Sequence, residues 1–98
     1  MAHKEVPASE HAALVAAGSQ LVDVREPHEV EAASLPDAIF IPLGSLPDRI
    51  GELDASRPVA LLCRSGGRSG QAAEFLTSNG FTDVTNLIGG MMSLGLQD

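Results

Sequence analysis

The stretch that decides the fold joins an apolar run to a glycine-rich segment: Pro58-Val59-Ala60-Leu61-Leu62-Cys63-Arg64-Ser65-Gly66-Gly67-Arg68-Ser69. The run 59–62 is the most continuously apolar in the chain, which predicts a buried strand at the centre of a parallel sheet. Beyond the glycines, Ala72 and Leu76 lie at helical spacing in a segment that ends near Gly80. Cys63, the only cysteine, is therefore expected where a strand turns into a helix.

That junction has the features that make a cysteine reactive. In parallel α/β sheets, ligands gather where a strand ends and the next helix begins, because free backbone amides there favour negative charge. In that field, and beside Arg64 and Arg68, the pKa of Cys63 should fall from ~8.5 into a range of roughly 3.5–7.5. The thiolate is then a ready nucleophile. Gly66-Gly67 leaves room for a ring of inward-pointing N–H groups that can hold an anion. Ser69 can cap the helix or donate its hydroxyl to the sulfur.

An inert, buried cysteine is the alternative interpretation. A lone cysteine after an apolar strand can be a small core residue, the two arginines can be surface charges, and the two glycines can make only a turn. The combination of strand, cysteine, two arginines, two glycines and helix favours the reactive site, with Cys63 as the catalytic residue.

The rest of the chain alternates short apolar runs with helix-like segments, which predicts one α/β domain with a mainly parallel sheet. The expected strands are residues 3–6, 21–24, 38–41, 59–62 and 84–87. The expected helices are 9–17, a short one from 27, 43–53, the segment after Cys63, and 91–96. We expect Ser9 and Ser45 to cap the first and third helices. Gly80 suits a left-handed helix end, with Phe81 folding back on Leu76.

Composition limits the partners and the compartment. We expect one domain over residues 1–98. A net charge of −7 argues against nucleic acid and repels small anions at long range, so any anion site must be local. The single thiol, the absence of an apolar N-terminal stretch and the absence of an apolar run near ~20 residues predict a cytoplasmic protein away from membranes. The three histidines show no metal-ligand spacing, so we expect no metal and no cofactor.

Three segments resemble the signatures of rhodanese-family sulfurtransferases. The loop 63–69 is similar to the family's active-site loop, 23–29 (Asp-Val-Arg-Glu-Pro-His-Glu) to its first signature, and 86–91 (Asn-Leu-Ile-Gly-Gly-Met) to its last. The order and spacing of strands match over nearly the whole chain, which looks like a free-standing single-domain rhodanese. The resemblance implies a central parallel sheet of about five strands flanked by helices.

The resemblance also implies a reaction. Cys63 would attack the outer sulfur of thiosulfate or another sulfane donor and hold a persulfide, which cyanide, a thiol or a protein acceptor then removes. Backbone amides of residues 64–68 would stabilise the persulfide, and Arg64 and Arg68 would hold the anionic end of the donor. The substrate-binding residues would be Arg64, Ser65, Gly66, Gly67, Arg68 and Ser69.

Loop length separates related chemistries. Cys63 to Arg68 is six residues, whereas the related cell-division-cycle phosphatases and arsenate reductases use seven, a wider cradle for a tetrahedral oxyanion. Six residues favour sulfur transfer. Two alternatives stay open: an interaction or sensing module that binds an oxidised or persulfidated partner with little turnover, and a phosphatase or arsenate reductase.

Residues outside the loop are expected to act in folding or at a surface more than in the chemistry. Residues 33–38 (Ala-Ser-Leu-Pro-Asp-Ala) replace the family's Gly-His-Ile-Pro-Gly-Ala, and Leu94 stands where a tryptophan is usual. We expect these departures to affect stability or a partner surface more than the chemistry. Asp23 and Arg25 should form a structural ion pair near the end of the sheet. The glutamates that follow, Glu26, Glu29 and Glu31, should form a solvated face that favours the helix start.

Overall fold

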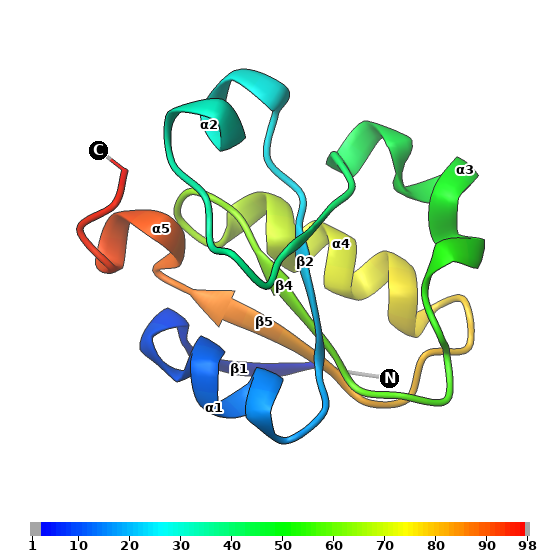
Figure 1. Cartoon of the computed structure of the whole chain (residues 1–98). Coiled ribbons are helices and arrows are strands. Elements are labelled where there is room, and N and C mark those ends of the chain that lie inside the picture. Colours follow the sequence, from blue (N-terminus) through cyan, green and yellow to red (C-terminus); the bar gives the residue numbers. More distant parts are fainter. Residues whose placement is uncertain (1–2, 98) are drawn as a thin grey trace.

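Five parallel strands form the sheet at the centre of the computed structural model, which describes residues 3–97 (Figure 1). Met1, Ala2 and Asp98 of the expected domain lie outside the described residues. The strand order is β1-β5-β4-β2-β3, and every pairing is parallel. The strands are β1 (Lys4–Pro7), β2 (Gln20–Asp23), β3 (Ile39–Phe40), β4 (Val59–Leu62) and β5 (Val84–Ile88). The predicted α/β class is confirmed, and β4 lies at the centre as its apolar run indicated.

Helices cover both faces of this sheet. The α-helices are α1 (His11–Ala16), α2 (Pro27–Ala32), α3 (Leu46–Arg49), α4 (Gly67–Thr77) and α5 (Gly90–Ser93). Short 3-10 turns are η1 (Ala8–Glu10), η2 (Leu43–Ser45) and η3 (Ile50–Glu52). Helices α3 and α4 pack on one face, and α1 and α5 pack on the other. Helix α2 follows β2 beyond the end of the sheet (Figure 1).

Strand side chains alternate between two hydrophobic cores, as the two-residue period of a strand requires. The core under α4 contains Val22, Val59, Leu61, Cys63, Ala72, Ala73, Leu76 and Val84, among others. The opposite core contains Ala8, Leu21, Leu35, Ala60, Leu62, Leu87 and Met91. Leu94, which stands where the family usually has a tryptophan, packs against this second core. The alternation directs Cys63, the residue after β4, toward the α4 side.

The segment 43–53 differs from its prediction as one helix. It forms η2, α3 and η3 in succession. Pro47 has no N–H to donate to the carbonyl of Leu43, so an α-helix cannot run from Leu43 onward. The expected cap is also wrong, because the Ser45 side chain makes no cap hydrogen bond. The four apolar side chains of the segment still pack on the α4-side core, as their spacing predicted.

Some of the predicted helix ends are confirmed by the structure and one is wrong. Ser9 does not cap the first helix, because it lies inside η1 and α1 begins two residues later. Gly80 is left-handed as predicted, with φ 94°. The amide of Phe81 donates to the carbonyl of Leu76 at 3.1 Å, and both side chains are buried in the same core. Pro27 begins α2, as its fixed φ favours.

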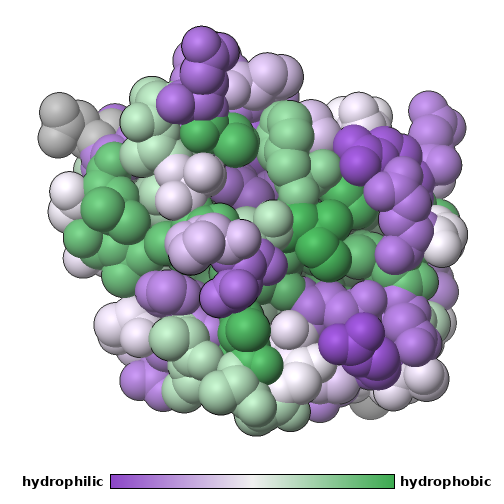
Figure 2. Space-filling model, viewed as in Figure 1, coloured by the Kyte–Doolittle hydropathy of each residue, from purple (hydrophilic) through white to green (hydrophobic). Residues whose placement is uncertain are grey.

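The surface carries a small apolar patch over α5, seen in green in Figure 2. Ile88, Met92 and Leu96 are 40%, 44% and 46% exposed, respectively. The amide of Met92 donates to the carbonyl of Arg64 at 3.0 Å, so this patch borders the Cys63 loop. Within the described part of the chain, none of the helices has the length and apolar character to cross a membrane.

Candidate functional site

Cys63 lies at the carboxyl end of β4, and its side chain faces the start of α4. The residue is only 1% exposed. Gly66 precedes α4 with φ 110°, a conformation that L side chains rarely adopt. This turn points the Gly66 amide at Cys63 Sγ, with an N···S distance of 3.0 Å. A Cβ at Gly66 would also come 3.4 Å from the amide nitrogen of Gly89. Glycine therefore allows the loop to close over the sulfur.

Hydrogen bonds stabilise the thiolate of Cys63 against the cost of burial. Burial raises the pKa of the thiol, but hydrogen bonds from the Ser69 hydroxyl and from the amides of Ser69, Gly66 and Ser65 outweigh it. The net pKa of Cys63 is lowered from its usual value. The direction agrees with the expectation, and the cause is mainly hydrogen bonding to the anion.

Ser69 and Asn86 form a hydrogen-bonded pair next to the sulfur. The Ser69 hydroxyl oxygen lies 3.3 Å from Cys63 Sγ and also makes a short contact with Asn86 Oδ1. Asn86 Nδ2 donates to the Gly66 carbonyl at 3.1 Å and to a Glu5 carboxylate oxygen at 2.9 Å, which fixes the orientation of the amide. One hydroxyl proton cannot serve both acceptors. We infer that it turns toward the sulfur when Cys63 ionises.

The turn between β5 and α5 supports the loop from behind. The amides of Met91 and Met92 donate to the carbonyls of Cys63 and Arg64, each at 3.0 Å. Gly90 makes this approach possible, because a Cβ at that position would lie 2.3 Å from the Cys63 carbonyl oxygen. The turn therefore holds the two peptide groups that directly follow the Cα of Cys63, one on each side of the Cα of Arg64.

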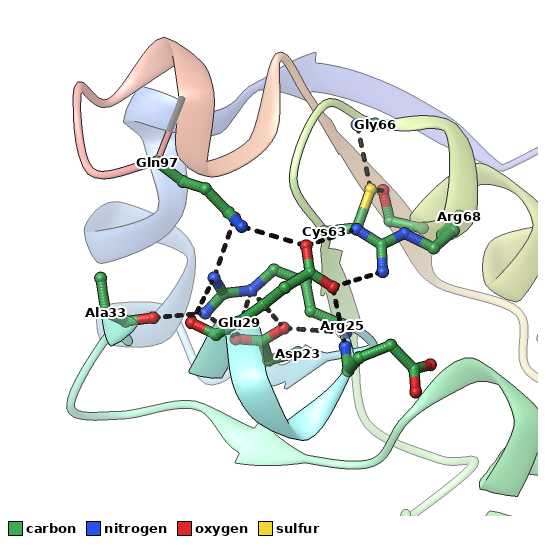
Figure 3. A network of polar contacts seen from close by, with 10 residues as sticks. Asp23, Arg25, Glu29, Ala33, Cys63, Gly66, Arg68 and Gln97 are labelled. Carbon is green, nitrogen blue, oxygen red and sulfur yellow. Dashed lines mark hydrogen bonds and ion pairs between the residues drawn. The ribbon is translucent and has the colours of Figure 1, made fainter. Parts of the chain in front are cut away.

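Arg68 is held by a carboxylate beside the sulfur (Figure 3). Its Nη1 and Nη2 lie 2.6 and 2.9 Å from the two carboxylate oxygens of Glu29. Glu29 is 9% exposed, so its predicted place on a solvated face is wrong. The Arg68 guanidinium lowers the pKa of Glu29 from 4.5 to about 2, although burial opposes the shift. Glu29, and more weakly the charge on Cys63, raise the pKa of Arg68. The guanidinium thus faces both groups.

A buried ion pair fixes the helix that carries Glu29. Arg25 is fully buried, and its Nε and Nη2 donate to the carboxylate of Asp23 at 2.7–3.1 Å, which confirms the predicted pair. Its Nη1 donates to Gln97 Oε1 at 2.9 Å and to the Glu29 carbonyl at 3.3 Å. Its Nη2 also donates to the Ala33 carbonyl at 2.7 Å. Arg25 therefore ties both α2 and the C-terminal segment to the end of β2.

A sequence model of the rhodanese-like domain matches residues 7–95. The chain belongs to the rhodanese-like domain family. Uncharacterized protein YqhL of Bacillus subtilis is 44% identical over 77 residues, which cover 79% of this chain and 61% of that protein. Thiosulfate sulfurtransferase GlpE of Pseudomonas syringae is 37% identical over 87 residues, which cover 89% of this chain and 82% of that protein. The chain thus spans less than two thirds of the Bacillus protein's length.

The fold comparison agrees with the sequence comparison. The crystal structure of SSP1007 from Staphylococcus saprophyticus matches with a TM-score of 0.85 and 28% identity, over 95% of this chain and 94% of that one. In this rhodanese-like chain, all the predicted loop residues, Cys63 to Ser69, lie together between β4 and the first turn of α4. Within residues 3–97, no group of three or more histidine, cysteine or acidic side chains is placed to hold a metal ion.

Sequence reasoning missed four residues that shape this rhodanese-like site: Glu29, Asn86, Gly90 and Gln97. Asn86 gave a usable signal, because it and Thr85 are the two polar residues of a strand whose other residues are apolar. Gly90 lies in a segment used only as a family signature. Gln97 gave no signal, since its contact with Glu29 joins residues 68 positions apart.

Removing the Ser69 hydroxyl should make Cys63 less acidic. In Ser69→Ala the thiolate loses one charge-assisted hydrogen bond, so the pKa of Cys63 should rise. At a pH below the wild-type midpoint, alkylation by iodoacetamide should slow by about tenfold or more, because such bonds are worth about 1.5–3 kcal/mol. Alkylation quenched after set times at several pH values, and followed by mass spectrometry, gives the pH profile. Ser78→Ala, an exposed site at the other end of α4, is the control. A midpoint equal to wild type would remove Ser69 from this role.

Proposed function

We propose that this rhodanese-like chain is a sulfurtransferase that carries a sulfane sulfur as a persulfide on Cys63. The observation that carries the proposal is the six-residue loop whose amides face Cys63 Sγ, with the Gly66 nitrogen at 3.0 Å. A ring of this size suits one additional sulfur atom. The similarity of the chain to thiosulfate sulfurtransferase GlpE supports the same chemistry. A protein with one unpaired thiol suits a reducing compartment such as the cytoplasm.

The proposed reaction has two displacements on sulfur. The Cys63 thiolate attacks the outer sulfur of thiosulfate or of a thiol persulfide. A bond forms between Sγ and that sulfur, and the donor's own sulfur–sulfur bond breaks, leaving with its electron pair as sulfite or as a thiolate. An acceptor, cyanide or a thiolate, then attacks the outer sulfur of the persulfide. Thiocyanate or an acceptor persulfide forms, and the Cys63 thiolate is restored.

The loop supplies charge stabilisation in both steps. The amides of Ser65, Gly66 and Ser69 already lower the pKa of Cys63. They would stabilise the negative charge of the persulfide in the same way, by donating hydrogen bonds to it. Because these donors are fixed by α4 and by the β5–α5 turn, little reorganisation is needed when the charge moves outward. Arg64 and Arg68 lie on the same loop and would act on an anionic donor, Arg68 only after it leaves Glu29.

Sulfur loading tests this proposal. After incubation with thiosulfate and removal of excess reagent, the intact mass should rise by one sulfur atom, located on Cys63 by peptide mapping. Cyanide should then remove that sulfur and yield an equal amount of thiocyanate. Protein alkylated at Cys63 beforehand is the control and should gain nothing. Wild-type protein that takes up no sulfur from thiosulfate or from a thiol persulfide would contradict the proposal.

An interaction module is the second candidate, and the apolar patch beside the loop favours it. Ile88, Met92 and Leu96 are exposed next to the segment that presents Cys63. A protein acceptor could cover this patch while its thiol reaches the sulfur, whereas cyanide has no use for it. Under this alternative, turnover with thiosulfate and cyanide is slow, but a preloaded persulfide passes rapidly to a protein thiol. Fast steady-state thiocyanate formation would exclude it.

Phosphate or arsenate chemistry has less support. The loop has six residues, and its Arg68 already binds Glu29 through both outer nitrogens. A phosphate or arsenate would have to displace that carboxylate, as would thiosulfate, whereas a thiol persulfide would not. Hydrolysis of an aryl phosphate by the purified protein, lost on alkylation of Cys63, would reverse this ranking.

A further inference from the structure

The carboxylate of Glu29 uses all its accessible acceptor sites within the structure. Arg68 occupies both oxygens, Gln97 Nε2 donates to Oε2 at 3.0 Å, and the Glu26 amide donates to Oε1 at 3.0 Å. Arg68 comes from the catalytic loop and Gln97 from the C-terminal segment, so both lie far from α2 in the sequence. The Glu29 side chain is 10% exposed. A bidentate, largely buried pair of this kind is held in one geometry.

The support beneath Glu29 is equally fixed. Arg25 is held by several hydrogen bonds, because its donors reach Asp23, the carbonyls of Glu29 and Ala33, and Gln97. Figure 3 shows these residues converging from α2, the end of β2 and the C-terminal segment. Rotating Glu29 away from Arg68 would therefore break several contacts at once. The carboxylate is placed to hold the guanidinium beside the sulfur.

The pair of Arg68 with Glu29, called the clamp below, lowers the positive charge that a donor meets beside the sulfur. Arg68 and Glu29 sum to zero charge, as do Arg25 and Asp23 beneath them. A dianionic donor could gain a full charge from Arg68 only if the guanidinium left Glu29. The chain's net charge of −7 repels such a donor as well. A protonated thiol persulfide places an uncharged outer sulfur at the loop and has no oxyanion group there, so it needs no free cation.

We propose that Glu29 is a specificity-determining residue, which clamps Arg68 and so disfavours dianionic donors such as thiosulfate relative to thiol persulfides. This inference rests on the proposed sulfur transfer from a donor to Cys63. With a thiol persulfide, the Cys63 thiolate bonds to the outer sulfur, the donor's sulfur–sulfur bond breaks, and the donor leaves as a thiolate with the electron pair. Glu29 acts through Arg68 and touches no reacting atom, so its role is positioning.

The test compares donors in Glu29→Gln, which keeps the shape but removes the charge. With thiosulfate, kcat/KM should rise by about tenfold, mostly through a lower KM, because a released guanidinium can bind the dianion. With glutathione persulfide, kcat/KM should stay within about twofold of wild type or fall. Glu31→Gln, on the exposed side of the same helix, is the matched control and should change neither donor. An unchanged or higher thiosulfate KM in folded Glu29→Gln would overturn the inference.

A double variant identifies the cation. In Glu29→Gln/Arg68→Gln the gain for thiosulfate should disappear, since the two effects are coupled through one pair. A gain that survives the loss of Arg68 would overturn the inference. Should Glu29→Gln fail to show the wild-type thermal transition, Glu29→Asp shortens the side chain by one methylene, weakens its two bonds to Arg68, and should lower the thiosulfate KM by a smaller factor. No movement in that variant would also overturn it.

Sulfate binding separates this inference from the proposed function. Amide chemical shifts of residues 65–69, followed by NMR during titration with sulfate, report dianion binding without any sulfur transfer. Sulfate should bind Glu29→Gln about tenfold more tightly than wild type or Glu31→Gln. If no donor loads Cys63, the proposed function fails, while the titration still decides whether Glu29 withholds Arg68 from dianions. Equal sulfate affinity in wild type and Glu29→Gln would overturn the clamp.

Discussion

Replacing Cys63 with serine should abolish sulfur uptake and lower kcat/KM with thiosulfate and cyanide by about 10⁴-fold or more. A serine hydroxyl does not ionise near neutral pH, so the loop amides would face a neutral group in place of a thiolate. Residues 3–97 contain no other cysteine, so no second thiol can take over. The measurements are intact mass after incubation with thiosulfate, and thiocyanate released on addition of cyanide.

The fold should survive this substitution, which keeps the result interpretable. Serine is slightly smaller than cysteine, and its hydroxyl can use the donors that now face the sulfur, the Gly66 amide and Ser69. We expect the free energy of unfolding to change by about 1 kcal/mol or less. Ser78→Ala, an exposed position at the end of α4, should retain full activity. Sulfur uptake by Cys63→Ser at the wild-type level would place the carrier elsewhere in the chain.

The sheet could be predicted because its signals are local. The apolar run at 59–62 became β4, the central strand, and each of the other expected strands exists with ends shifted by at most one residue. Helix continuity was harder. The spacing at 43–53 correctly gave the buried face, but Pro47 prevents a continuous α-helix. The spacing of apolar residues takes no account of the backbone N–H that proline lacks.

The candidate site was predictable where it is contiguous and hidden where topology assembles it. Cys63 to Ser69 could be found as one run of sequence. Glu29 and Arg68 are 39 positions apart, and they meet because β2 and β4 are parallel neighbours whose carboxyl ends lie side by side. Strand β5, on the other side of β4, brings Asn86 to the same loop. Such contacts need the strand order, which spacing along the chain does not contain.

Gly90→Ala should be the most damaging substitution outside the loop. An added Cβ would lie 2.3 Å from the carbonyl oxygen of Cys63 and 2.5 Å from that of Arg64, both rigid backbone atoms. Gly90 also has φ 52°, which costs a non-glycine residue about 1–2 kcal/mol. Adding overpacking of about 1–3 kcal/mol, we expect a loss of about 2–5 kcal/mol in the free energy of unfolding. Denaturant unfolding measures this loss.

Controls within the chain separate the clash from the backbone strain. Gly95 has φ 73° in the same C-terminal segment, but a Cβ added there would meet nothing within 4 Å, so Gly95→Ala should show the strain alone. Gly44, with open space and ordinary φ, should tolerate alanine with little change. Because the clash falls on the Cys63 and Arg64 carbonyls, Gly90→Ala should also displace the loop and shift the pH profile of Cys63 alkylation, which Gly95→Ala should leave unchanged. Equal stability and equal alkylation profiles for the two alanine variants would show that the β5–α5 turn does not hold the sulfur in place.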